Sequence, residues 1–325
     1  MVKRSIGKLD WGGSRPPGRS RPTPVLRFTR QVLIMNHPGR LTVCLPILAA
    51  MLGLIAINST SAQDAAATAT SLVYPLDVSV ADDAKTLYLV DRKLPGLWKA
   101  TGDGSLVVLY PAKKKFRTPL NAVRCITGDG KGGLLVGDSG TREVYRVTPD
   151  GKATPLTKGG IGIAMGIAVG GDGTIFVSDL ELQRIWSVPA AGGTPKEFAV
   201  LPAPRGMTFD KNGQLWVVSG GPRNQLVKIA ADGKITPVVK DRTFIYPNDV
   251  AVAADGTAYV SDGYADCIWK VAANGDATKW VQGKPLDNPV GLDWQGNNLL
   301  VVDSRAKQLF SITPDAKLTA VKLGK

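Results

Sequence analysis

The chain has 325 residues, with 40 Lys and Arg against 27 Asp and Glu, and a formal net charge of +13 at pH 7. Its one histidine is His37, which excludes imidazole as a base or metal ligand for everything after that position. The first 62 residues hold nine of the basic residues and one of the acidic ones, so the remaining 263 residues carry a net charge of only +5.

The first 62 residues have the layout of a segment that directs export. The apolar run LTVCLPILAAMLGLIAI, residues 41–57, follows Arg40 and precedes the small residues of NSTSAQD. We expect a signal peptide over 35–62, with translation starting at Met35 and cleavage near Ala62, after a disordered or mis-assigned extension over 1–34. The alternative is an uncleaved anchor, which 17 apolar residues barely allow. Cleavage would leave no membrane span and a periplasmic or secreted protein.

Residues 63–325 contain an internal repeat. The segments LYLVD, LLVGD, IFVSD, LWVVS, AYVSD and LLVVD recur at intervals of 40 to 47 residues, ending at Asp91, Asp138, Asp179, Ser219, Asp262 and Asp303. A turn sequence such as GDG, PDG or ADG follows each segment at a nearly constant offset. Two landmarks that keep step through six units indicate a single domain of six repeats.

Each unit contains four short apolar runs. In the fifth unit these are DVAVA, TAYVSD, CIWKVA and TKWVQ, separated by ADG, GYAD and NGD. Near-alternating runs rich in Val, Ile, Trp and Tyr are typical of strands, and Asp-Gly or Asn-Gly between them is typical of hairpins. The sequence therefore predicts an all-β, six-bladed β-propeller of four-stranded antiparallel blades over residues 63–325. Cys125 and Cys267 fall in apolar runs of different blades, which predicts buried, unpaired side chains.

Two stretches carry a family resemblance. AMGIAVGGDGTIFVSDLELQRIWSVPAAGG resembles the NHL repeat, and YPNDVAVAADGTAYVSDG is similar to a blade of the SMP-30, gluconolactonase and strictosidine synthase group. The resemblance extends over all six units and implies a six-bladed propeller, but such blades serve unrelated functions. The streptogramin lyases and amidating lyases that share this architecture rely on histidine, which this chain lacks after residue 37.

For the lactonases of that group, the resemblance implies a divalent metal such as Ca²⁺ at the propeller axis, held by one Glu and several Asn or Asp. The positions before the first apolar run of each unit are here Leu76, Val123, Met165, Arg205, Asn248 and Val290. Only Asn248 matches, with Asp249 and Asp77 one position further on, and a hard cation needs several oxygen ligands. We expect no cofactor and no metal site. A divergent metal-dependent lactonase or hydrolase around Asn248, Asp249 and Asp77 is the alternative.

The aspartates that close the repeated segments invite a catalytic interpretation, because carboxylates can act as acids and bases. Their recurrence at one place in five blades instead favours a structural role, as short acceptors for backbone N–H groups in the connection that follows. A catalytic pair would break the symmetry. No catalytic residue is predicted.

The asymmetry of the sequence lies in its charge. Alternating strand directions gather the second-to-third and the between-blade connections on one face, and these are rich in Lys and Arg, as in YPAKKKFRTPLN. Such charge is either ordinary solvated surface or a means of attracting an anion. Arg205 and Arg124, at the mouth of the central channel, could bind a carboxylate, sulfate or phosphate through the guanidinium fork.

The sequence thus predicts an exported binding or scaffold module. Its expected partner is an anionic small molecule, an acidic glycan or an extracellular protein. Phe116, Phe244 and Tyr246 would offer stacking surfaces to RNA, but export makes nucleic acid an unexpected partner. The predicted ligand-binding residues are Arg124, Arg205, Tyr246, Asn248, Asp249 and Asp77.

Overall fold

The computed structural model describes residues 68–69, 71–115 and 117–324. The chain divides into two units, residues 1–60 and residues 61–325. The extension predicted over 1–34 and the signal peptide predicted over 35–62 lie outside the described residues, as does Phe116. Among the described residues, no helix is long and apolar enough to cross a membrane.

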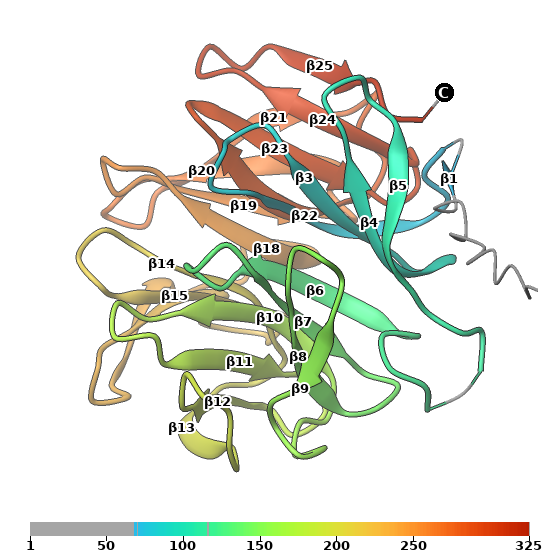
Figure 1. Ribbon diagram of the computed structural model, residues 1–325. Helices are drawn as coiled ribbons and strands as arrows, with labels where there is room; N and C mark the ends of the chain where they lie inside the picture. Colours follow the sequence, from blue (N-terminus) through green and yellow to red (C-terminus); the bar gives the residue numbers. More distant parts are fainter. Residues whose placement is uncertain (1–67, 70, 116, 325) are drawn as a thin grey trace, which may run out of the picture. The chain divides into compact units, whose positions relative to one another are not determined.

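The described residues form six antiparallel sheets and no helix (Figure 1). The first three sheets contain β2 (Pro75–Val80), β3 (Leu87–Asp91), β4 (Leu94–Ala100) and β5 (Leu106–Pro111); β6 (Val123–Gly128), β7 (Leu134–Asp138), β8 (Glu143–Val147) and β9 (Ala153–Pro155); and β10 (Ala164–Val169), β11 (Ile175–Asp179), β12 (Arg184–Val188) and β13 (Lys196–Val200).

The remaining sheets contain β14 (Pro204–Phe209), β15 (Leu215–Ser219), β16 (Leu226–Ile229) and β17 (Ile235–Val239); β18 (Pro247–Val252), β19 (Ala258–Asp262), β20 (Cys267–Val271) and β21 (Ala277–Gln282); and β22 (Pro289–Gln295), β23 (Asn298–Asp303), β24 (Gln308–Ile312) and β25 (Leu318–Val321). Each sheet is one blade of four consecutive strands, and a short strand β1 (Thr68–Ala69) pairs with β5 at the outer edge of blade 1. The predicted six-bladed propeller is confirmed.

The first strand of each blade is the innermost one. The strands β2, β6, β10, β14, β18 and β22 contact one another around the axis, and β2 contacts β22. The ring therefore closes between blades 1 and 6 by packing, without an exchanged strand among the described residues. Ser304 Oγ donates to the Pro75 carbonyl at 2.6 Å across this closure, and Leu300 packs with Leu89 in a shared apolar cluster.

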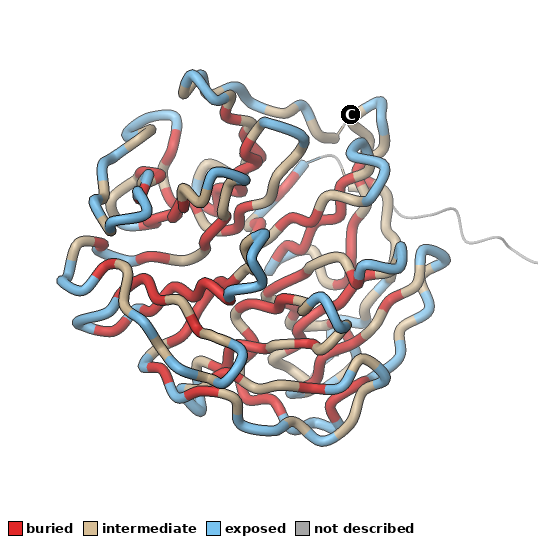
Figure 2. The backbone as a smooth tube through the Cα atoms, turned by 90° about the vertical axis from the view of Figure 1, so that its left-hand side faces the viewer, coloured by how far each residue is buried: buried red, intermediate tan, exposed pale blue. Residues whose placement is uncertain are grey.

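The apolar cores lie between neighbouring blades. Figure 2 shows the buried backbone running along the inner and central strands, while the turns at the rim are exposed. The second strand of most blades is buried along its whole length, as in β7 and β19, because both faces of that strand pack against adjacent blades. Cys125 and Cys267 are buried and free, as predicted.

The repeated aspartates tie each blade together, and we call Asp91, Asp138, Asp179, Asp262 and Asp303 the connection aspartates. Asp303 accepts N–H groups from Asp287 and Asn288 before the blade, and from Arg305 and Ala306 after its second strand. The other four accept backbone N–H groups in the same manner. The predicted structural role is confirmed, and it extends to the preceding connection as well.

Candidate functional site

The innermost strands surround a cavity of about 300 Å³ at the propeller axis. The first residue of each inner strand pairs with the last residue of the strand beside it, as Val123 does with Asp138 and Pro204 with Ser219. A register shift follows at once in each blade. The residues that lie at one level around the cavity are therefore Leu76, Arg124, Met165, Arg205, Asn248 and Val290.

This register corrects one sequence-based assignment. Val123 was expected at the ring position of blade 2, but it is buried and lines a separate side pocket, while Arg124 takes the ring position. The six predicted ligand-binding residues, which include Arg124, all line the same cavity. Their role in ligand binding stays a prediction.

Arg205 is the best enclosed cation of the cavity. It is the second residue of β14, the inner strand of blade 4, is only 8% exposed, and its Nε has no hydrogen-bond partner among the described residues. One Nη donates to Asn248 Oδ1 at 3.4 Å, and the guanidinium carbon lies 4.1 Å from the centre of the Tyr246 ring. Because Arg205 is held by an aromatic ring and an amide, its guanidinium forms no ion pair with a carboxylate of the described residues.

The Tyr246 ring belongs to a stack of four side chains at the mouth of the cavity. Tyr246 and Tyr264 are stacked, with their centroids 4.6 Å apart and an interplanar angle of 21°. The guanidinium of Arg205 covers the Tyr246 ring, and that of Arg305 lies 5.6 Å from the Tyr264 centroid. This arrangement holds two guanidinium groups on one rigid wall through cation–π contacts.

Arg124 and Arg92 form the opposite part of the mouth. Arg124 Nε donates to Ser139 Oγ at 3.0 Å, and burial together with the nearby charges of Arg92 and Arg205 lowers the pKa of Arg124. Arg92 lies 6.0 Å from the Tyr74 ring. No described carboxylate forms an ion pair with Arg92, Arg124, Arg205 or Arg305.

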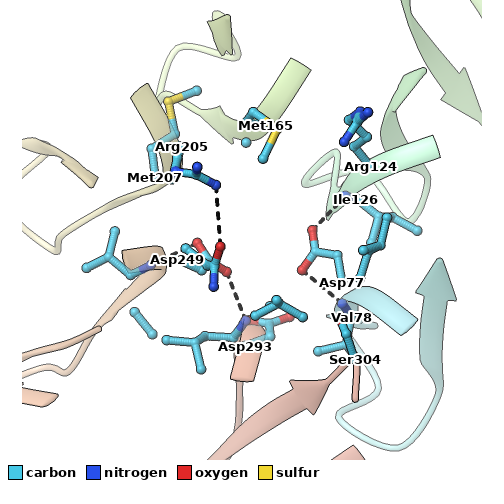
Figure 3. Close-up of a pocket in the computed structure, with 18 of the residues that line it drawn as sticks. Asp77, Val78, Arg124, Ile126, Met165, Arg205, Met207, Asp249, Asp293 and Ser304 are labelled. Atoms are coloured by element: carbon cyan, nitrogen blue, oxygen red, sulfur yellow. Dashed lines mark hydrogen bonds between the residues drawn. The ribbon is translucent and has the colours of Figure 1, made fainter. Parts of the chain in front are cut away.

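Three carboxylates lie in the same cavity, and we call Asp77, Asp249 and Asp293 the channel aspartates. Figure 3 shows Asp77 and Asp249 pointing toward one another across the channel. Each accepts the N–H of the next residue on its own strand and one from the inner strand of the following blade. The donors are Val78 and Ile126 for Asp77, Val250 and Leu292 for Asp249, and Trp294 and Val80 for Asp293, at 2.7–2.9 Å.

These bonds link the inner strands of blades 5, 6, 1 and 2, whereas blades 2, 3 and 4 have Cys125, Gly166 and Gly206 at the position of Asp77 and Asp249. Gly206 makes room for Asp249, since a Cβ at that position would approach Asp249 Oδ1 to 1.9 Å. Gly291 makes room for Asp77 in the same way, with a closest approach of 2.4 Å. Asp249 and Asp77 therefore depend on a glycine in the preceding blade.

Burial dominates the ionisation of the channel aspartates. Desolvation and the charge of Asp293 raise the pKa of Asp249 to about 7, although two backbone hydrogen bonds oppose this increase. Desolvation raises the pKa of Asp293 to about 6. Desolvation and then the charge of Asp249 raise the pKa of Asp77 well above its ordinary value. Ionisation of one channel aspartate disfavours ionisation of its neighbours, because like charges in a low-dielectric site repel each other.

The residues present do not suit a divalent metal of the lactonase type. Asn248 Oδ1, the one matching ligand atom, faces the guanidinium of Arg205, and Asn248 Nδ2 donates to the Pro289 carbonyl at 3.1 Å. Both oxygens of Asp77 and of Asp249 accept backbone N–H groups. The described residues include no group of three or more His, Cys, Asp or Glu placed to hold a metal ion.

Several residues of the cavity were not among the predicted site residues. Asp293 replaces the Ser, Thr or Ala found at its level in the other blades, in the run GLDWQ, and Tyr264 is the one aromatic residue in the second-to-third connections. Both departures from the repeat could have identified them. Phe244, by contrast, is 1% exposed and packs in the core beside Trp269, so it offers no stacking surface.

The curated proteins that resemble this chain in sequence match only a short stretch of it. No protein-family model matches the chain. A stretch of 111 residues is 35% identical to peptidyl-glycine alpha-amidating monooxygenase A of Xenopus laevis, covering 30% of this chain and 12% of that protein. A stretch of 94 residues is 31% identical to a probable peptidyl-alpha-hydroxyglycine alpha-amidating lyase of Caenorhabditis elegans, covering 26% of this chain and 27% of that protein. The chain thus spans about a quarter or less of the length of these relatives.

Solved structures match most of the chain. A streptogramin B lyase superposes with a TM-score of 0.62 at 18% identity, covering 80% of this chain and 86% of that one. A gluconolactonase from Xanthomonas campestris superposes with a TM-score of 0.63 at 16% identity, covering 78% of this chain and 88% of that one. The chain has the fold of a six-bladed propeller. The resemblance predicted from the repeats is confirmed at the level of the fold. A shared fold does not by itself imply a shared reaction.

Proposed function

We propose that this six-bladed propeller binds a small anionic molecule at the mouth of its central channel. The observation that carries the proposal is Arg205, a buried guanidinium with an unpartnered Nε and no carboxylate partner among the described residues. A buried, unpaired charge is costly, and the cost is recovered when a carboxylate or phosphate accepts two parallel hydrogen bonds from the guanidinium. The Tyr246 ring and Asn248 hold the fork in place before the ligand arrives.

The size of the cavity supports a small molecule over a polymer or a protein. About 300 Å³ is at the lower end of the range for small-ligand pockets. The exposed lysines of the loop over 113–115 lie outside the cavity and would attract an anion toward the face. An acidic glycan or an extracellular protein bound along that face remains the other class of partner, and the proposed setting is outside the cytoplasm, after removal of the predicted signal peptide over 35–62.

Calorimetric titration of the purified protein with acetate and with inorganic phosphate tests this proposal. We expect saturable binding that weakens as the salt concentration rises, and that weakens at least tenfold in Arg205→Gln. Arg223 is an exposed arginine in a connection of the same face, so Arg223→Gln removes the same charge outside the cavity and should change the affinity less than twofold. Equal losses in the two variants would reject the proposed site.

A second candidate function is supported by the channel aspartates. A carboxyl group with a pKa of about 7, such as Asp249, is suited to donate a proton to a leaving group near neutral pH. On this alternative the protein is a divergent lactonase or ester hydrolase in which Asp249 and Asp293 act without imidazole. Turnover of a lactone and ester panel that disappears in Asp249→Asn would support it, and the absence of turnover above the buffer rate would remove it.

A further inference from the structure

A second pocket adjoins the mouth of the channel between blades 1 and 2. It has a volume of about 180 Å³ and is lined by the connection after β3 and the end of the 111–122 loop. Arg92, Arg124 and Leu76 line both this side pocket and the channel. The two cavities are therefore neighbours with a shared wall, and the shared wall carries two guanidinium groups.

The polar groups of the side pocket suit an acidic group. Ser139 Oγ accepts the Nε hydrogen bond of Arg124 and itself donates to the Ala122 carbonyl at 3.0 Å, so the Nη edge of the Arg124 guanidinium stays available. Asp91 is the one carboxylate on the wall, and its oxygens accept N–H groups from Val73, Tyr74, Lys93 and Leu94. The cations of the pocket thus have no counter-ion among the described side chains.

We infer that the channel and the side pocket form one two-part site for a small dicarboxylate, with one carboxylate on Arg205 and the other on the pair Arg92 and Arg124. This inference rests on the proposed function and extends it to the ligand class. Arg124 feels the charges of both Arg92 and Arg205, so the three guanidinium groups repel one another in the free protein. A dianion relieves this repulsion at both ends, whereas a monoanion relieves it at one.

Titration of the purified full-length protein with linear dicarboxylates from succinate to suberate, each beside the monocarboxylate of the same length, tests the inference at constant ionic strength. We expect one chain length, such as that of adipate, to bind at least tenfold more tightly than its monocarboxylate, here hexanoate. In Arg124→Gln the ratio of dicarboxylate to monocarboxylate affinity should fall toward one. In Arg205→Gln both ligands should weaken.

Matched variants separate this arrangement from general attraction to a basic face. Arg223→Gln should leave the affinity ratio within twofold of the original protein, and Arg124→Lys, which keeps the charge but not the fork, should lower the ratio if Arg124→Gln fails to fold. Dicarboxylates that bind no more tightly than monocarboxylates at every length would overturn the inference and leave the proposed function standing. Binding of neither class would overturn both.

Discussion

The connection aspartates and the channel aspartates are the same residue type placed in opposite environments. In the first set, burial opposes the ionisation of Asp179, but hydrogen bonds from the Trp186 indole and from backbone N–H groups outweigh this, and the pKa of Asp179 lies below its ordinary value. Asp249 represents the second set, with two backbone donors and a neighbouring carboxylate, and its pKa rises to about 7. The number of donors decides whether a buried carboxylate stays ionised.

The comparison also separates scaffold from site. The connection aspartates recur in five blades and hold each of these blades to the connection before it, while Ser219 takes this position in blade 4. The channel aspartates occupy only the junctions of blades 5, 6, 1 and 2 and lie beneath the four arginines. Departure from the repeat therefore marks the part of this propeller that the fold alone does not require.

The largest expected effect is the loss of a connection aspartate. Asp303→Ala leaves the N–H groups of Asp287, Asn288, Arg305 and Ala306 without their acceptor in a fully buried position. We expect the free energy of unfolding to fall by about 3–5 kcal/mol, measured by denaturant titration. The exposed Asp241 has no such donors, and Asp241→Ala should change stability by less than about 0.5 kcal/mol. Similar losses in both variants would contradict the structural role.

Asp249 and Asp179 should make the stability of the protein respond to pH with opposite signs. In the folded state Asp249 binds a proton that the unfolded chain releases above pH 4, so the stability of the original protein should fall relative to Asp249→Asn between pH 4 and pH 7. We expect a relative change on the order of 3 kcal/mol. For Asp179, whose pKa is lowered, the advantage over Asp179→Asn should be present above pH 4 and be lost as the pH falls further.

Unfolding free energies of the three proteins at pH 3, 4, 5.5 and 7 measure both slopes. Slopes of the same sign for the two variants would show that the environments of Asp179 and Asp249 do not differ as described.

The smallest expected effect is on anion binding, after a substitution at the mouth of the channel. Tyr264 is 57% exposed and supports both Tyr246 and Arg305, so Tyr264→Ala should weaken anion binding about two- to fivefold, as the loss of an exposed cation–π contact predicts. Its unfolding free energy should change by less than about 1 kcal/mol. A large loss of stability with unchanged affinity would assign the tyrosine stack to the scaffold instead.

The sequence predicted more of the scaffold than of the site. Six repeated segments ending in Asp were sufficient to predict the blades and the role of Asp303, because each blade is built from neighbouring residues. The ring position of blade 2 was assigned to Val123 instead of Arg124, because the apolar pattern does not show the register shift that follows Val123. Asp293 depends on a contact with Val80, 213 residues away, and only ring closure brings those residues together.

The central claim is that Arg205 binds the acidic group of a ligand. The most direct measurement is a crystal structure of the protein with 4-bromobenzoate, in which the anomalous signal of bromine locates the ligand independently of any assumed pose. We expect one bromine site in the channel, with the carboxylate at about 3 Å from an Nη atom of Arg205. A bromobenzoate that occupies only positions outside the channel, while water alone contacts Arg205, would contradict it.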